Sequence, residues 1–224
     1  MKRLALLACT LSLIATSACA DTDQADQESA TIVHENIVTT WFQAGAPAGP
    51  DDQGISNESS AWYSNWAQHM CTVDYDGSRK LEQKDCDNLY YFALPCADYD
   101  EAGPIPEHIA MSPRGEYEES AFKNRWIQVN LRLGSLIRTV FVQWQDVGPL
   151  YTDDCKYVFG GERPRQERTG DVESALDLSP AAFKYLVGDL SIGQLKTEWR
   201  FVDDVEVPPG PWTKNITTAG PDWD

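Results

Sequence analysis

Residues 175–202 read ALDLSPAAFKYLVGDLSIGQLKTEWRFV, which combines a brief strand, a helix and a longer strand. Ser179 is in the favoured N-cap position of a helix that begins at Pro180, and Gly188 follows its last turn. Apolar and polar residues alternate over 195–202, the pattern of a half-buried strand. The stretch therefore predicts a strand that leads directly into a capped helix, followed by a second strand.

Upstream of this stretch, the sequence alternates strand-like and loop-like segments. Alternation is clear in 126–131 and again in 139–145, where Asp146 and Pro149 mark the end of the strand. Residues 61–70 suggest a short helix, with Trp62 and Trp66 on one face. Several short strands with one well-capped helix favour a mostly β barrel or sandwich. The strands are expected at 32–42, 89–94, 126–131, 139–145, 175–178 and 195–202.

The composition narrows the class of protein. The 224 residues allow one domain or two small ones. With 18 Lys and Arg against 35 Asp and Glu, the formal net charge is −17, which disfavours nucleic acid and anionic membrane surfaces as partners. Hydrophobic residues make up 42% and aromatic residues 11% of the chain, too much for overall disorder.

The N-terminus predicts export from a bacterial cytoplasm. A basic start and the apolar run 4–14 are typical of a signal peptide over 1–20, and the run is too short to span a bilayer. Two outcomes stay open. Cleavage after Ala20 would give a secreted protein, whereas 16–19 resembles a lipobox that would make Cys19 the lipidated N-terminus of an outer-membrane or periplasmic lipoprotein. Residues 21–31 are a flexible polar tether, and 32–224 form a single domain.

Four cysteines remain after the leader, and an even number in an exported chain indicates two disulfides with three possible pairings. Cys71–Cys86 with Cys96–Cys155 is preferred, because the first bridge closes a short polar loop. The sequence has no CxxC motif and its three histidines are scattered, so no metal site and no cofactor are expected.

Residues 175–183, Gly193 and 196–202 resemble the catalytic-type domain of bacterial expansins. Residues 139–146 and the Thr-containing first strand 38–41 match the same domain. The wider family is the double-psi β-barrel, which includes family 45 endoglucanases, barwin-like proteins and rare lipoprotein A. The resemblance implies a mainly β, six-stranded double-psi barrel with one short capped helix and long disulfide-tied loops.

The same resemblance implies a site. The Asp of the Leu-Asp-Leu-Ser motif, required for wall loosening in expansins and the general acid in the endoglucanases, corresponds to Asp177. The Asp that ends the preceding strand corresponds to Asp146, and the first-strand Thr to Thr39 or Thr40. The endoglucanase base has no counterpart in 41–43, which favours binding or loosening without hydrolysis.

The aspartates also have structural interpretations. Inverting hydrolysis needs a protonated carboxyl and an ionised one about 6.5–9.5 Å apart. Asp177, at a strand-to-helix junction, fits the acid, although it also fits a turn or capping carboxylate. Asp146 begins a good turn signature. Asp98, Asp153 and Asp154 are expected on the solvated surface.

The tryptophans are the second indication of sugar binding, because sugars pack their C–H faces on aromatic rings. Those in alternating strands are expected in the core, whereas those that border loops are candidates for a binding surface. The core group is Trp126, Trp144 and Trp199, and the surface group is Trp41, Trp62, Trp66 and Trp212.

We therefore expect a monomeric, exported, expansin-like protein that binds or loosens cell-wall or extracellular polysaccharide, such as glucan or peptidoglycan, without hydrolysis. The net charge points to neutral rather than strongly acidic glycans. One alternative is a glycan-cleaving enzyme, either a glycoside hydrolase or a lytic transglycosylase, with Asp177 as general acid. Another is a non-catalytic surface-binding lipoprotein. A membrane contact is expected only through the lipid on Cys19.

Overall fold

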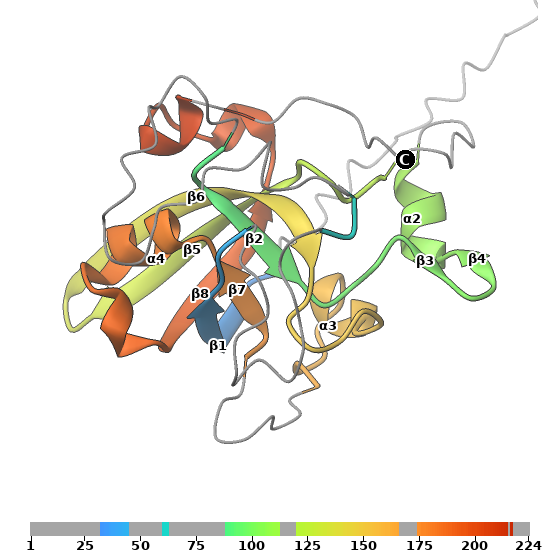
Figure 1. The fold of residues 1–224 in the computed structure, drawn as a ribbon, viewed down its shortest axis with the longest axis horizontal. Helices are drawn as coiled ribbons and strands as arrows, with labels where there is room; N and C mark the ends of the chain where they lie inside the picture. The colour runs from blue at the N-terminus through green and yellow to red at the C-terminus, as the bar shows by residue number, and fades with distance from the viewer. Residues whose placement is uncertain are drawn as a thin grey trace, which may run out of the picture. The chain divides into compact units, whose positions relative to one another are not determined.

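The structure is a computed structural model that describes residues 32–44, 60–62, 88–112, 120–165, 174–214 and 216. Six of its strands close into a barrel in the order β1-β7-β2-β6-β5-β8 (Figure 1). The protein is therefore mainly β with a closed six-stranded barrel, as predicted. The barrel strands are β1 His34–Trp41, β2 Tyr91–Leu94, β5 Trp126–Leu133, β6 Leu136–Val147, β7 Leu176–Leu178 and β8 Leu195–Val202.

The strand connections are interleaved. β1 pairs in parallel with β7, and β2 pairs in parallel with β6, while the remaining neighbours are antiparallel. The β1–β2 connection thus passes over β7, and the β6–β7 connection passes over β2. Two interleaved connections of this kind are the double-psi arrangement.

The barrel interior is filled by alternate residues of every strand. Trp144 and Trp199 are buried there, as their alternating strands predicted. Trp126 is also buried, as predicted, but on the other face of β5, in register with Gln143 and Val202. Phe122 stacks on Trp144 with ring centroids 5.2 Å apart. The main core also contains Phe92, Leu94, Ile127, Val129, Leu131, Val140, Val142, Leu176 and Leu178. Burial of this apolar set is the main contribution to stability.

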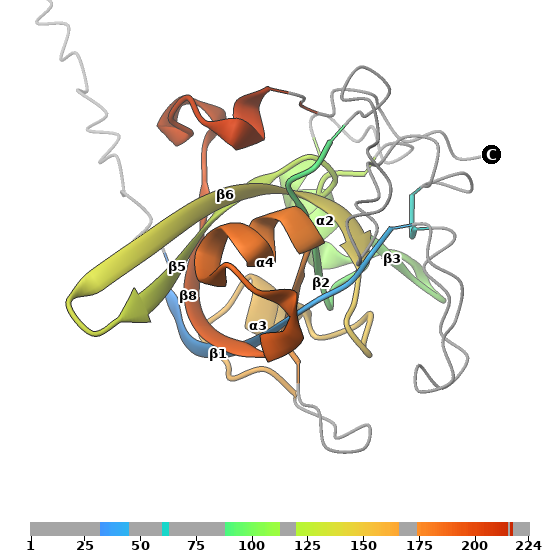
Figure 2. The same ribbon diagram turned by 60° about the vertical axis from the view of Figure 1, so that its left-hand side comes forward.

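Helix α4 (Pro180–Val187) is drawn in front of the ring of strands in Figure 2; it packs against β6 and β1 and buries Ala182, Phe183 and Leu186 in the core. Its ends are as predicted. The Ser179 hydroxyl accepts a hydrogen bond from the Ala182 amide, and Gly188 takes the left-handed conformation at φ 87° that ends the helix.

The other short elements were not predicted from the sequence. They are β3 Tyr99–Asp100, β4 Gly103–Pro104, α2 Pro106–Met111, α3 Cys155–Val158 and the 3-10 turns η3 Leu190–Ile192, η4 Asp204–Glu206 and η5 Pro211–Thr213. Helix α3 buries Tyr157 and Val158 in the core. No helix in the described part of the chain has the length and hydrophobicity to span a bilayer.

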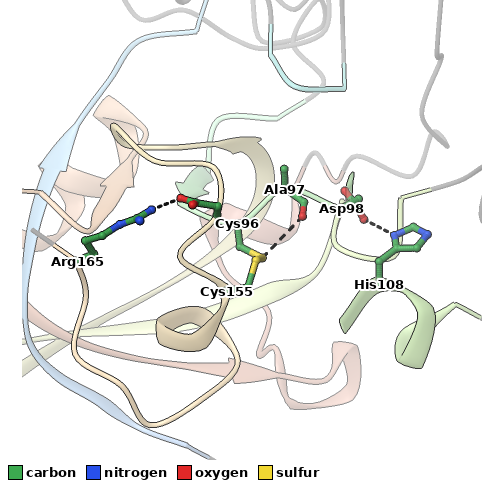
Figure 3. Close-up of a disulfide and its surroundings, with 7 residues drawn as sticks. Cys96, Ala97, Asp98, His108, Cys155 and Arg165 are labelled. Carbon is green, nitrogen blue, oxygen red and sulfur yellow. Dashed lines mark hydrogen bonds and ion pairs between the residues drawn. A yellow bond between two sulfur atoms is a disulfide. The ribbon is translucent and has the colours of Figure 1, made fainter. Parts of the chain in front are cut away.

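One of the two expected disulfides is confirmed. Cys96 is bonded to Cys155 across 59 residues, which joins the end of β2 to helix α3 (Figure 3). Cys71 and Cys86 lie outside the described residues, as does nearly all of the helix expected at 61–70.

Candidate functional site

The two candidate aspartates lie in one row on the outer face of the barrel. Asp177 on β7 is paired in register with Thr40 on β1 and with Ala93 on β2. Ala93 is also in register with Asp146 on β6. Residues in register share a face of the sheet, so four neighbouring strands contribute Thr40, Asp177, Ala93 and Asp146 in that order.

A β-bulge brings Asp146 into this row. The register of β2 and β6 shifts between the pairs Phe92–Trp144 and Ala93–Asp146, so Gln145 is an extra residue on β6. Without the shift, Asp146 would share the inward face of Trp144, because side chains alternate along a strand. The bulge directs the carboxyl outward, and Gln145 instead donates a hydrogen bond from Nε2 to Asn124 Oδ1 at 2.8 Å.

The carboxyl of Asp177 is held by two hydroxyl groups. Thr40 and Ser174 both donate to its Oδ1, and their own hydroxyl oxygens lie 2.6 Å apart. Burial raises the pKa of Asp177, while these two hydrogen bonds act in the opposite direction. Both hydrogen bonds that the described residues make to this carboxyl fall on Oδ1.

Asp146 is held by backbone amides. The amide of Ala61 donates to its Oδ1 at 2.8 Å. Burial raises the pKa of Asp146 to about 7; the amides of Ala61 and Val147 oppose this shift, and the nearby charge of Asp177 adds to it. The two carboxyls therefore interact electrostatically, although β2 lies between them.

Ala93 lies between the two acids in the row and is buried in a small cluster with Phe42, Ala44 and Tyr91. Adjacent strands are about 4.8 Å apart, so residues on β6 and β7 that flank β2 have Cα atoms about 10 Å apart. Inverting glycosidases hold their two carboxyl groups about 6.5–9.5 Å apart, a range close to this Cα spacing.

Of the two threonines expected in the site, Thr40 is the one in the row. Thr39 is fully buried inside the barrel, where its hydroxyl lies 2.7 Å from that of Thr197. The site also contains Ser174 and Ala93, which sequence reasoning missed. Ser174 lies three residues before Asp177, and no periodicity marks it because its role depends on a contact with β1.

The tryptophans expected at a binding surface differ in exposure. Trp41 is partly exposed and donates from Nε1 to the Leu190 carbonyl at 3.1 Å. Trp62 and Trp212 are buried, and their Nε1 groups donate to Asp98 Oδ2 and to the Pro208 carbonyl. Their rings offer no open face to a glycan. Trp66 and Cys19 lie outside the described residues.

The expectation that Asp98 is a solvated surface acid is wrong. Only 2% of its surface is exposed, and Figure 3 shows its carboxylate pointing to the ring of His108. It accepts hydrogen bonds from the Ser120 hydroxyl, the Ala121 amide and the Trp62 indole, and its Oδ1 lies 2.7 Å from His108 Nδ1. Four partners satisfy the carboxylate, so its burial is tolerated.

Asp153 is exposed and pairs with Arg165, as expected of a surface acid. Within the described segments, no group of three or more His, Cys, Asp or Glu side chains is placed to hold a metal ion. The candidate chemistry therefore rests on the row of Thr40, Asp177, Ala93 and Asp146, with Ser174 beside it.

The raised pKa of Asp146 predicts how stability depends on pH. A carboxyl whose pKa is higher in the folded state stabilises the fold below its unfolded pKa of about 4, and this stabilisation is lost as pH rises through about 7. Asp146→Asn keeps an acceptor for the Ala61 amide but cannot ionise. The quantity to compare is the free energy of unfolding of the variant minus that of wild type, measured with urea. We expect this difference to be about 2–4 kcal/mol larger at pH 8 than at pH 5.

The control is Asp204→Asn, because Asp204 is exposed on η4 and should leave the pH dependence unchanged. The stability of Asp146→Asn still depends on pH to some extent, because burial also raises the pKa of Asp177. Burial lowers the pKa of His34, which stacks on Trp199, to about 4, so its opposite effect falls between pH 4 and 6.5. If the stability of Asp146→Asn relative to wild type were the same at pH 6.5 and at pH 8, the prediction would be contradicted.

Comparison with known proteins adds little to this geometry. No family model and no curated protein matches the chain. Among solved structures, a Streptomyces papain inhibitor (SPI) matches with 18% sequence identity and a TM-score of 0.29, over 77% of this chain and 96% of that chain. A similarity at this level carries no argument about function.

Proposed function

We propose that this is an exported protein that binds or loosens wall or extracellular polysaccharide without hydrolysing it, through the row of Thr40, Asp177 and Asp146. The observation that carries the proposal is the alignment of these polar residues across four strands, with only Ala93 between the two carboxyls. Such a row offers hydrogen-bonding groups along a line, as an extended glycan requires.

The protonation of the carboxyls supports action without hydrolysis. Burial raises the pKa of both Asp177 and Asp146, and that of Asp146 reaches about 7, so Asp146 favours the protonated form at mildly acidic pH. A protonated carboxyl donates hydrogen bonds to sugar hydroxyls and ring oxygens, but it cannot act as the ionised base that inverting hydrolysis needs.

The same carboxyls support a second candidate, a glycan-cleaving enzyme with Asp177 as general acid. Two acids with interacting charges titrate in separate steps, so near neutral pH one proton can remain while the other is lost. A lytic transglycosylase would need Asp177 alone as acid and base. The two candidates differ in one product, the new sugar ends that cleavage releases.

The test is Asp177→Asn in the purified full chain. The asparagine Oδ1 still accepts hydrogen bonds from Thr40 and Ser174, but the variant lacks the ionisable group. We expect wild type to bind insoluble cellulose or peptidoglycan and to weaken it mechanically with no new reducing ends. The variant should lose about tenfold or more of the weakening activity, the equivalent of one strong hydrogen bond.

Asp204→Asn is again the control and should retain full activity. If wild type released soluble sugars and Asp177→Asn did not, the proposal would be rejected in favour of a glycan-cleaving enzyme. A wild-type protein that neither binds nor alters these polysaccharides would reject both and favour a surface lipoprotein that recognises another partner.

A further inference from the structure

Three polar side chains at the Asp177 end of the row form a triangle of oxygen atoms, here called the hydroxyl triangle: Thr40, Ser174 and Asp177. Thr40 Oγ1 lies 2.6 Å from Ser174 Oγ, and Ser174 Oγ lies 2.9 Å from Asp177 Oδ1. Thr40 Oγ1 is in close hydrogen-bond contact with the same Oδ1. Each side of the triangle therefore joins two oxygens that are near enough to share a proton.

A count of protons shows what the hydroxyl triangle requires. Each hydroxyl carries one proton, so Thr40 and Ser174 supply two protons for three sides. If Asp177 is ionised, one side holds two oxygens in contact with no proton between them, which is repulsive. The Leu176 carbonyl, 3.2 Å from Ser174 Oγ, is a further acceptor and supplies no proton. A third proton on Oδ1 gives every side one hydrogen bond, because each O–H then donates to one neighbour and accepts from the other.

The partners of Asp146 are of a different kind. Backbone amides of Ala61 and Val147 hold its carboxyl, and an N–H group can donate but cannot accept. A hydroxyl group does both, so it can bond a protonated carboxyl as well as an ionised one. The amides therefore suit an ionised Asp146, whereas the hydroxyl triangle accommodates a neutral Asp177. Burial, which raises the pKa of Asp177, acts in the same direction.

We propose that Asp177 is protonated at neutral pH and that its O–H group closes a ring of three hydrogen bonds with Thr40 and Ser174. Ser174 is then a positioning residue that holds the proton of Asp177 on Oδ1. The titratable neighbour in the row is Asp146, since Thr40 and Ala93, in register with Asp177 on β1 and β2, do not titrate. The use of this proton in polysaccharide binding rests on the proposed function, whereas the ring itself does not.

The test is the sign of the pKa change of Asp177 in Ser174→Ala, measured from its ¹³Cγ chemical shift as the full chain is titrated with base. A hydroxyl that only donates to a carboxylate stabilises the ionised form, so its loss would raise the pKa. Loss of a ring member instead removes two of the three bonds of the neutral form. We therefore expect the pKa of Asp177 to fall by about one pH unit, the size of one net hydrogen bond. Thr40→Val, which keeps the shape of the side chain, should act in the same direction.

Ser191 provides the matched control. Its hydroxyl donates to Asp189 Oδ2 at 2.8 Å and its amide donates to Oδ1, an exposed pair in which no second hydroxyl from the described residues takes part. These hydrogen bonds lower the pKa of Asp189. Ser191→Ala should therefore raise the pKa of Asp189, opposite to the effect of Ser174→Ala on Asp177. Repeating the titrations in Asp146→Asn removes the acid that interacts with Asp177.

The outcomes separate the ring from the proposed function, because the titration needs no polysaccharide. An Asp177 that is ionised in wild type at neutral pH, or whose pKa rises or stays constant in Ser174→Ala, rejects the ring and leaves the proposed function standing. A fall in the pKa supports the ring even if no polysaccharide is bound.

The pH profile of the weakening activity connects the ring to the proposed function. If activity needs the protonated carboxyl, it is present below the pKa of Asp177 and is lost as pH rises through it. Ser174→Ala should therefore lose activity at a lower pH than wild type, by the same shift as its pKa. A merely structural role of Ser174 would lower activity at every pH without moving the profile, and that result would reject the use of this proton in the proposed function.

Discussion

Replacing Asp98 with alanine should lower the free energy of unfolding by about 3–5 kcal/mol, because it removes one partner of a buried charged network. The carboxylate is 2% exposed and satisfies Trp62 Nε1, the Ser120 hydroxyl and the Ala121 amide. It also lies 2.7 Å from the buried ring of His108. Alanine leaves these buried groups without their acceptor, and urea unfolding at neutral pH measures the cost.

Two further variants make this result specific. Asp98→Asn keeps the shape and one acceptor oxygen, so it should be less destabilising than alanine but still cost about 1–3 kcal/mol. The exposed Asp204→Asn should change stability by no more than about 0.5 kcal/mol. If Asp98→Ala lowered the free energy of unfolding by less than about 1 kcal/mol, the network would contribute less to stability than predicted.

Removal of the disulfide should have an effect of similar size. The double variant Cys96→Ala/Cys155→Ala opens a loop of 59 residues, for which the chain-entropy account gives about 4 kcal/mol. Both cysteines are changed together so that no free thiol remains at this place. Loss of the Cys96 side chain, which is fully buried at the end of β2, adds to the cost. The measurement is urea unfolding of both proteins under oxidising conditions.

A reductant provides the control, since it should destabilise wild type. Reductant also reaches any bridge between Cys71 and Cys86, and its effect on the double variant measures that contribution alone. The difference between the two effects then belongs to Cys96–Cys155. A double variant as stable as the oxidised wild type would contradict the prediction.

The candidate site itself reduces stability. Two carboxyls with raised pKa values lie two strands apart on one face, and the charge of Asp177 opposes ionisation of Asp146. Residues that bind or react often carry such a cost, and their replacement by neutral side chains commonly stabilises a fold. Asp146→Asn is expected to be more stable than wild type at pH 8, and Asp177→Asn is expected to be less active. Both results together would show that the site lowers stability while it supports function.

Local patterns were sufficient for the elements of the barrel. Alternation predicted β5, β6 and β8, and the helix signals at Ser179, Pro180 and Gly188 predicted both ends of α4. These signals act between residues within a few positions of each other, so they can be identified in a sequence without knowing its fold. The Cys96–Cys155 bridge was among the possible pairings, and the interleaved barrel was implied by the resemblance around Asp177.

The membership of the site depended on contacts between distant segments. Thr40 and Asp177 are 137 residues apart, and only the parallel register of β1 and β7 shows that Thr40, rather than Thr39, faces the carboxyl. A shift of one residue would reverse the two side chains, because their direction alternates along a strand. The bulge at Gln145 reverses the expected direction of Asp146 in the same way.

Burial likewise could not be read from local composition. Asp98 lies in an acidic, loop-rich segment that resembles solvated surface, yet its four partners come from residues 10 to 36 positions away. Trp62 and Trp212 border loops but pack against residues brought to them by the closed barrel. Local sequence patterns determined which segments become the barrel strands and helix α4. The closure of the barrel determined which side chains meet, because strand register and burial are set by partners far along the chain.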